Sequence, residues 1–343
     1  MMSAVCTWAY DDFDYDFEKD GIYYNILNEN DKTVEVAKGP YVAEVIIPSK
    51  VNGYNVVAIG KSAFEGHGEA SIEMYGEEHW KPLISITIPN GVTSIGKCAF
   101  ENCENLSSVI LPEGLTSIGD DAFGFCVKLT SVKIPSSVTH IGTCAFFCTG
   151  LKSIIIPNGI TTINAGAFGG TNLVSVEIPS GVTCIGEGAF QECKKLSSVK
   201  IPNTVTTIET SAFGFCESLT SIIIPSSVTK ISDLAFEYCN NLVSISNYAV
   251  TPQVVYFTDY AENGILHVIK GLKEVYEKAQ GWEVYTVIDD LDAENETSIG
   301  SITLGDNNNA KIYTLDGRIA DSNKLKKGIH IKDGKKFYVK CIE

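Results

Sequence analysis

The sequence predicts a repeat solenoid, a stack of coils built from short parallel strands and turns with about 23 residues per turn. Two markers recur in phase: a phenylalanine after alanine, and a proline after an apolar residue. From Phe100 onward, successive phenylalanines are separated in sequence by the same number of residues as Phe100 and Phe123, or by one residue fewer. Such a period is typical of solenoids, so we place the repeat at residues 41–250. The phenylalanines are Phe64, Phe100, Phe123, Phe146, Phe168, Phe190, Phe213 and Phe236.

One unit shows how each coil is expected to fold. Leu129, Val132 and Ile134 have the L-x-x-L-x-L spacing of a leucine-rich repeat strand. Successive side chains of a strand point to opposite faces, so Val132 and Ile134 should point inward and Lys133 outward. A single coil cannot bury its apolar face, but stacked coils can. The phenylalanines should therefore form one continuous column inside the solenoid.

A glycine follows the second isoleucine of the unit in several turns. We interpret it as a turn residue that needs a positive φ, which glycine adopts at little cost. The position holds Asn164, Glu209 and Ser232 in other turns, so the requirement is not absolute. The glycines are Gly60, Gly96, Gly119, Gly142 and Gly186.

Most of the cysteines follow the register of the repeat. Cysteine recurs three residues after the phenylalanine, except that Cys148 follows Phe146 by two residues. We expect a column of buried free thiols, because a reduced cysteine packs as a small hydrophobic residue. Disulfides are the alternative, since stacked neighbours lie about 5 Å apart. The members at the regular spacing are Cys103, Cys126, Cys193, Cys216 and Cys239.

Charge and motifs exclude several classes of function. The net charge of −16 disfavours nucleic acids and anionic membrane surfaces. No run of about 20 apolar residues is present, so we expect no membrane span. The sequence has no nucleophile elbow, no phosphate-binding glycine motif and no C-x-x-C cluster for zinc. We therefore expect no enzyme, no metal and no cofactor.

The complete unit reads L-x-S-V-x-I-P-x-x-V-x-x-I-G-x-x-A-F-x-x-C. It resembles the BspA-type leucine-rich repeat family, also called leucine-rich repeat 5, over residues 41–247. The resemblance implies a surface protein of Bacteroidota that adheres to host or matrix proteins, or to other cells. It also implies caps at residues 10–40 and 251–290, which an open solenoid needs to cover its apolar ends.

The two ends of the chain have their own signatures. Residues 1–9 resemble the tail of a secretory signal peptide, and an ordinary N-terminal segment is the alternative. Residues 291–300 form a polar, acidic linker. Residues 301–343 resemble the small C-terminal β-sandwich of secreted Bacteroidota proteins, often a sorting signal, with a hairpin turn expected at Asp333-Gly334.

Two columns of identical polar residues run along the repeat. We expect them to be architectural, because small side chains fit a tight coil and bond to their neighbours. The alternative is a polar ladder for glycans or ice-like lattices. The serines are Ser85, Ser108, Ser131, Ser153, Ser175, Ser198, Ser221 and Ser244. The threonines are Thr93, Thr116, Thr139, Thr161, Thr183, Thr206 and Thr229.

Candidate binding residues lie where the repeats differ. The outward strand position holds three isoleucines, which favours a partner patch, together with lysine and glutamate for steering. The alternative is β-propensity on a sheet surface. The outward residues are Thr87, Ile110, Lys133, Ile155, Glu177, Lys200, Ile223 and Ser246.

The first turn is longer than the others, because it carries an insertion between Phe64 and Pro89. Insertions in repeats tend to lie on the binding face. We expect Tyr75 and Trp80 to contact the ligand, and a solvated loop is the alternative. His67 in the same loop fits no known metal-site spacing.

These observations predict a secreted or cell-surface protein, associated with the outer membrane, that binds an extracellular macromolecule through its solenoid. A protein ligand is favoured. A glycan ligand is the second possibility, and it calls for exposed aromatic platforms, of which the sequence offers Tyr75 and Trp80. The third is a structural envelope protein without a ligand.

Overall fold

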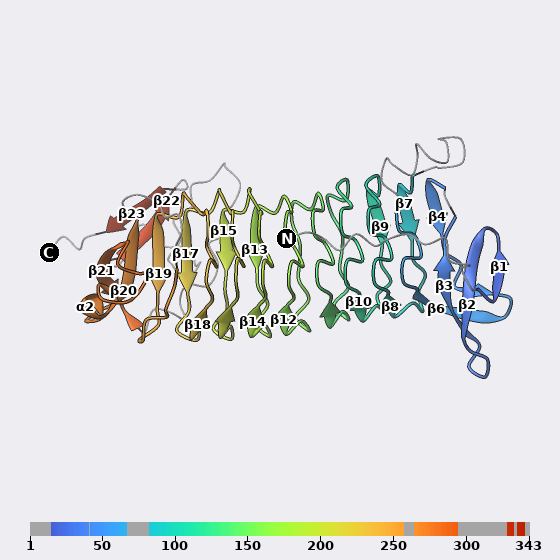
Figure 1. Cartoon of the computed structure of the whole chain (residues 1–343), viewed down its shortest axis with the longest axis horizontal. Coiled ribbons are helices and arrows are strands. Elements are labelled where there is room, and N and C mark those ends of the chain that lie inside the picture. Colours follow the sequence, from blue (N-terminus) through green and yellow to red (C-terminus); the bar gives the residue numbers. More distant parts are fainter. Residues whose placement is uncertain are drawn as a thin grey trace.

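In the computed structural model the chain is an elongated solenoid of stacked coils, about 23 residues each (Figure 1). The structure describes residues 15–40, 42–66, 82–256 and 264–293, and the backbone of 328–332 and 335–339. Residues 1–9, most of the linker at 291–300 and the inserted loop with Tyr75 and Trp80 lie outside these ranges.

An antiparallel unit precedes the coils. It consists of β1 (Phe17–Lys19), β2 (Ile22–Asn28) and β3 (Thr33–Lys38), and β3 runs parallel to β6 (Tyr54–Ile59) of the first coil. The strand β5 (Lys50–Val51) pairs antiparallel with β6. Tyr24, Val34 and Val36 are buried between this unit and the first coil. The unit therefore extends the core to the N-terminal end of the solenoid.

Two series of short strands run along the solenoid. Within each series, a strand that pairs with the strand of the next coil runs parallel to it. The first series is β4 (Glu44–Ile46), β7 (Ser85–Thr87), β9 (Ser108–Ile110), β13 (Ser175–Glu177), β15 (Ser198–Lys200), β17 (Ser221–Ile224), β19 (Ser244–Asn247), β20 (Ile265–Ile269) and β21 (Thr286–Leu291). The second is β8 (Ser94–Ile95), β10 (Ser117–Ile118), β11 (His140–Ile141), β12 (Thr162–Ile163), β14 (Cys184–Ile185), β16 (Thr207–Ile208) and β18 (Lys230–Ile231).

Both ladders are interrupted at the same place, within a stretch that the structure describes throughout. In the first series no strand forms between β9 and β13, and in the second β11 does not pair with β12. The first series has a further break, because β15 does not pair with β17. The interruption lies between the coils of Phe146 and Phe168, and both coils have one residue fewer than the others in the turn after the phenylalanine. Backbone hydrogen bonds on the turn side still join these coils, for example from Phe146 N to Ala167 O at 3.0 Å.

The phenylalanine column is confirmed. Seven consecutive ring pairs from Phe64 to Phe236 are stacked, with centroids 5.1 to 5.8 Å apart and interplanar angles of 2 to 13°. The rings from Phe100 to Phe213 are almost completely buried. Stacked aromatic pairs contribute about 0.5–1.5 kcal/mol each beyond the area they bury, so this column is a principal source of the stability of the solenoid.

The cysteine column is buried, and the described cysteines are free thiols, as expected. Each thiol at the regular spacing donates a hydrogen bond to the carbonyl of the preceding phenylalanine in the stack, as from Cys126 Sγ to Phe100 O at 3.2 Å. In the two shortened coils Thr149 and Thr171 occupy the position, and their hydroxyls bond to the carbonyl of their own phenylalanine. The column is therefore a set of small side chains that satisfy buried carbonyls.

The prediction for the glycines is wrong: none of the five has a positive φ. A Cβ on Gly142 would lie 2.4 Å from Asp120 N, and one on Gly119 would lie 2.7 Å from Gly96 C. The glycine is thus needed because adjacent coils approach too closely for a side chain. Positive φ occurs two residues later instead, as at Asp121 and Cys144.

At the other end the solenoid closes over β21 and the short helix α2 (Lys273–Tyr276). Tyr276 donates its hydroxyl to Ala249 O at 2.7 Å, and the buried Trp282 donates Nε1 to Gln253 O at 2.7 Å. No helix in the described part of the chain has the length and apolar character needed to cross a membrane.

In the C-terminal segment β22 (Gly328–Lys332) and β23 (Lys335–Val339) form an antiparallel hairpin. Lys332 pairs with Lys335, so the turn falls at the expected position. The rest of the sandwich expected over residues 301–343 lies outside the described residues.

Candidate binding face

The strands of the first series place the outward side chains in one column. Ile46 aligns with Thr87 and Thr87 with Ile110, because β4, β7 and β9 are paired in register. Further along, Glu177 aligns with Lys200. Ile223 likewise aligns with Ser246. The outward residues that lie on paired strands therefore share one side of each of these three sheets.

Three isoleucines of this column are strongly exposed: Ile155 at 85%, Ile46 at 78% and Ile110 at 58%. Ile46 was not among the predicted residues. Its signal was present in the sequence, since Val45-Ile46-Ile47-Pro48 repeats the end of the strand unit. Ile223 differs from expectation because it is half-buried beside the paired strand β19. Within the outward column, the strongly exposed isoleucines thus all precede β13.

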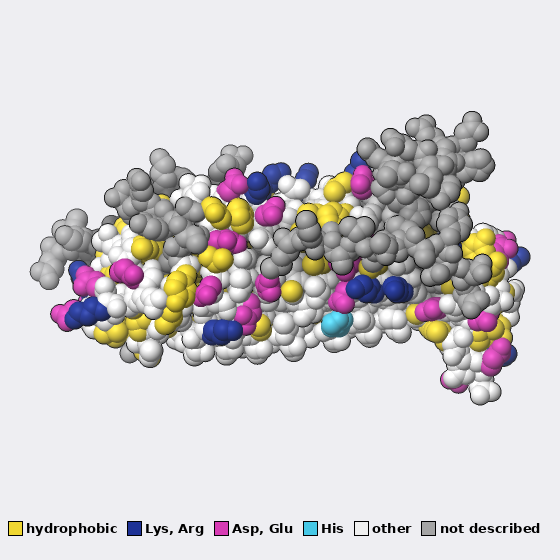
Figure 2. All heavy atoms as spheres, viewed as in Figure 1, with side chains coloured by type: hydrophobic (Ala, Val, Ile, Leu, Met, Phe, Trp, Pro, Cys, Tyr) yellow, Lys and Arg dark blue, Asp and Glu magenta, His cyan; other side chains and the backbone are white. Residues whose placement is uncertain are grey.

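The charged residues of the column are engaged with each other or with neighbours. Lys133 Nζ lies 2.5 Å from Glu113 Oε1, and Lys200 forms an ion pair with Glu177. Both pairs are exposed, and such pairs contribute about 0–1 kcal/mol to stability. Figure 2 shows the same mixture on the face that it displays, where basic and acidic side chains lie singly between small hydrophobic patches. The column thus offers little net charge for steering a partner.

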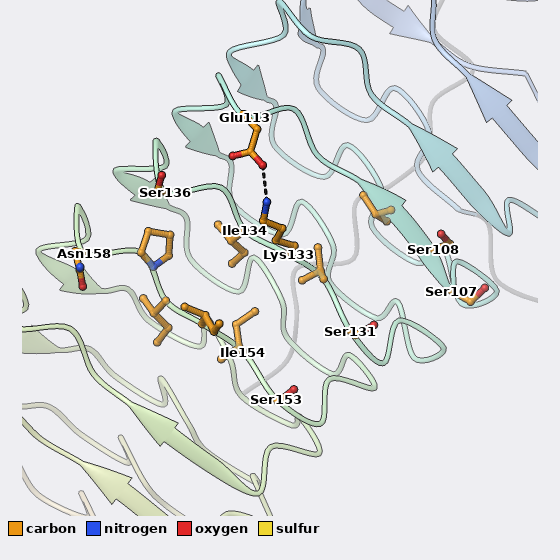
Figure 3. A pocket seen from close by; sticks show the side chains of 15 residues that line it. Ser107, Ser108, Glu113, Ser131, Lys133, Ile134, Ser136, Ser153, Ile154 and Asn158 are labelled. Carbon is orange, nitrogen blue, oxygen red and sulfur yellow. Dashed lines mark hydrogen bonds and ion pairs between the residues drawn. The ribbon is translucent and has the colours of Figure 1, made fainter. Parts of the chain in front are cut away.

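An open groove of about 710 Å³ lies on this face at the interruption of the first ladder (Figure 3). Its lining includes Ser108, Ser131 and Ser153 of the serine column. Lys133 and Ile155 of the outward column also line it. The structure therefore gathers two of the eight predicted outward residues into one concave site and leaves the others along the sheet. Those others are Thr87, Ile110, Glu177, Lys200, Ile223 and Ser246.

The floor of the groove is apolar. Val109, Val132 and Ile154 occupy the inward strand position, yet all three are half-buried, whereas Val176 in the same position is 4% exposed. Val199 in β15 is also half-buried, and β15 does not pair with β17 of the following coil. The extra exposure thus occurs beside breaks in the first ladder. The groove combines an apolar floor with a rim of serine hydroxyls and one ion pair.

The threonine column behaves as an architectural feature. Thr116 Oγ1 donates to Thr93 O of the preceding coil at 2.9 Å, and Thr206 Oγ1 donates to Thr183 O at 3.2 Å. Equivalent contacts recur along the column. The hydroxyls are therefore occupied in joining coils.

Exposed aromatic residues were missed beyond the inserted loop. Phe125 is 37% and Tyr238 41% exposed, and both lie in the turn after the stacked phenylalanine. Phe125 meets Phe147 edge to face at 5.5 Å, and Tyr238 stacks on Phe215 at 4.5 Å. The signal was an aromatic residue two positions after the column phenylalanine.

Among the described residues no group of three or more histidine, cysteine or acidic side chains is arranged to hold a metal ion. His67, Tyr75 and Trp80 lie outside the described ranges. No described histidine lines the groove, and its acidic residue, Glu113, is paired with Lys133. Among the described residues, the lining of the groove thus brings together no acid, base and nucleophile.

Comparison with known protein families matches the family described as BspA type leucine rich repeat region, in six copies, over residues 59–196 and 162–261. These matches span more than half of the chain. The chain belongs to this family. The BspA-type repeat explains the parallel coils, the phenylalanine column and the turn glycines as features of one unit.

Comparison with solved structures finds leucine-rich repeat proteins, one of which has a TM-score above 0.5. One from Bacteroides ovatus is 27% identical and has a TM-score of 0.57, with 80% of this chain and 77% of the other covered. The leucine-rich repeat protein of T. pallidum is 26% identical, with a TM-score of 0.45 over 66% and 90%. A leucine-rich cell surface protein from Faecalibacterium prausnitzii is 24% identical, with a TM-score of 0.46 over 84% and 98%. No curated protein matches the chain.

Proposed function

We propose that this BspA-type chain is a secreted or cell-surface adhesion protein that binds a protein ligand, from the host matrix or another cell, through the outward strand face. The observation that carries the proposal is the exposure of Ile46, Ile110 and Ile155 in the outward column of the strand face. The three side chains recur at every second coil of one column, beside the apolar floor of the groove, and an exposed apolar surface of this extent marks an interaction site.

The chemistry of the groove favours a polypeptide. Val109, Val132 and Ile154 supply an apolar floor, and Ile155 projects beside it. No aromatic side chain of the described residues lines the groove, so a sugar ring would find no platform among them. Serine hydroxyls and the Lys133–Glu113 pair at the rim suit the mixed polar surface of a protein.

Family membership supports the location. The BspA-type resemblance implies a surface protein of Bacteroidota, associated with the outer membrane, and a role in binding in place of catalysis. Leucine-rich repeats are scaffolds, and function lies in the surface residues that the scaffold leaves free. The boundaries between the caps at 10–40 and 251–290, the solenoid and the C-terminal domain at 301–343 are part of the same proposal.

The test is binding of the purified chain to immobilised fibronectin, laminin and collagen by surface plasmon resonance. Ile110→Asp with Ile155→Asp should weaken binding about tenfold or more, because a buried charge replaces an apolar contact. Val250→Asp is the matched control, since Val250 is 69% exposed and lies outside the strand face.

Thermal unfolding of the three proteins should coincide, because all three positions face solvent. Unchanged affinity of the double variant would contradict the role of the strand face. Absence of binding to every protein in the panel, with signal confined to a parallel glycan array, would replace the protein ligand by a glycan.

A further inference from the structure

The turns opposite the strand face carry two aromatic pairs that the proposed adhesion site does not use. Phe125 and Phe147 lie on consecutive coils, as do Phe215 and Tyr238. The stacked column of each coil is complete without them. They belong to the surface of the turn side.

Three of these four residues occupy an unfavourable backbone conformation. Phe125 and Phe215 have φ of 59° and Tyr238 has φ of 52°. Side chains with a Cβ rarely adopt this region, and bulky ones least of all. The conformation is fixed by the stacking of coils, because Phe125 N donates to Phe147 O at 2.8 Å and Phe215 N donates to Glu237 O at 2.7 Å.

Packing does not demand an aromatic residue there. The equivalent position, two residues after the column phenylalanine, is Asn102, Gly170 or Glu192 in other coils, all with positive φ. Those coils stack with the same ring spacing. The positive φ therefore belongs to the coil, and these aromatic side chains occupy a position that packing leaves open to small or polar residues and where their own backbone preference is unfavourable.

The surroundings of the two pairs are polar. In the turn of Phe125, Lys128 Nζ reaches Asn105 Oδ1 of the preceding coil at 2.5 Å. In the turn of Phe215, Glu217 lies 3.2 Å from Lys194. All of these groups are exposed or half-buried. Each site is thus a small aromatic surface with hydrogen-bonding side chains in the same turn.

This combination fits a carbohydrate better than a protein. The C–H face of a pyranose stacks on an aromatic ring, and its hydroxyls bond to nearby amide and charged groups. A stable protein interface needs a contiguous patch of about 800 Å² on each partner, whereas each pair here is isolated. The two pairs are separated by four coils, about 22 Å along the phenylalanine column, which suits a polymer that engages both.

We propose that the two pairs, Phe125–Phe147 and Phe215–Tyr238, form a second binding face for neutral polysaccharides on the turn side of the solenoid. Neutral polymers are specified because the net charge of −16 repels uronic and sulfated ones. The site is separate from the outward strand face and does not depend on the adhesion proposal.

The experiment is native affinity electrophoresis of the full chain in gels that contain arabinoxylan, galactomannan, mixed-linkage β-glucan or dextran, with heparin as the anionic counterpart. At least one neutral polymer should retard the wild-type chain, and heparin should not. Phe125→Gly with Tyr238→Gly should weaken retardation about tenfold or more. Glycine suits the positive φ, so the variant should remain folded.

Glu192→Gly is the matched control, because it relieves the same backbone strain in the same column and leaves the rings in place. The strand-face variant with Ile110→Asp and Ile155→Asp should be retarded like the wild type. The proposal is overturned if no neutral polymer retards the wild type, if the aromatic double variant is retarded equally, or if Glu192→Gly loses the same affinity.

Discussion

The spacing of the coils can be tested at a single glycine. Gly142 faces the backbone of the preceding coil, and a Cβ at this position would lie 2.4 Å from Asp120 N and 2.5 Å from Gly119 C. Contacts below 3.0 Å to backbone atoms force a shift, and neither atom belongs to a flexible side chain. Gly142→Ala should therefore separate two coils locally and cost about 1–3 kcal/mol, as overpacking of a core does.

Gly114→Ala is the control, because a Cβ there would meet nothing within 4 Å and its φ is not positive. Alanine should be neutral or stabilise by about 0.4–1 kcal/mol by restricting the unfolded chain. Urea unfolding followed by circular dichroism compares the two midpoints with that of the wild type. A Gly142→Ala midpoint equal to that of Gly114→Ala would refute the close-approach explanation.

Three further outcomes are expected. Phe168→Ala should lose about 3–5 kcal/mol in the same unfolding assay, and a loss below about 1 kcal/mol would show that the ring column is dispensable. Thr116→Val removes the hydroxyl bond to Thr93 O and should cost about 0.5–1.5 kcal/mol; a neutral effect would favour a binding role for this column. Burial raises the pKa of the Cys103 thiol to about 12 and that of Cys193 to about 11. The folded state therefore favours the neutral form of these two thiols. This stabilisation is complete below the unfolded thiol pKa of about 8.5 and is lost as the pH rises towards the folded values of about 11 and 12. Unfolding midpoints between pH 8 and 11 check this, and a midpoint that rises with pH would contradict it.

The periodic features were predictable because identical coils impose identical environments. The regular spacing of Phe100 and its equivalents predicted the aromatic stack, and the register of Cys126 predicted that its thiol lies in the core. Gly142 was correctly placed but misinterpreted, because a sequence pattern does not distinguish a glycine that needs positive φ from one that needs room. Distances between coils decide that question, and they depend on the whole stack.

The candidate site was less predictable for a related reason. Exposure depends on how closely neighbouring coils pair, so Ile155 and Ile223 have the same repeat position but different burial. The groove arises where the ladders stop, near two coils that are one residue shorter. That shortening is visible in the sequence as the reduced steps on either side of Phe168, but its effect on strand pairing is not. Ile46 was missed because its coil precedes the inserted loop, out of step with the regular spacing.

The interrupted ladders have a mechanical consequence. Hydrogen bonds between coils run along the long axis of the solenoid, so tension between its two ends loads the coil interfaces in series. Most interfaces have at least one paired ladder that shares this load with the turn-side bonds. Neither ladder is paired between the coils of Phe146 and Phe168, so the load falls mainly on turn-side bonds such as Phe146 N to Ala167 O. Single hydrogen bonds from Lys152 N to Thr130 O and from Asn164 Nδ2 to Ile141 O add to them. An anchored molecule pulled by its ligand should therefore yield first at that interface, beside the groove on the face proposed to hold the ligand.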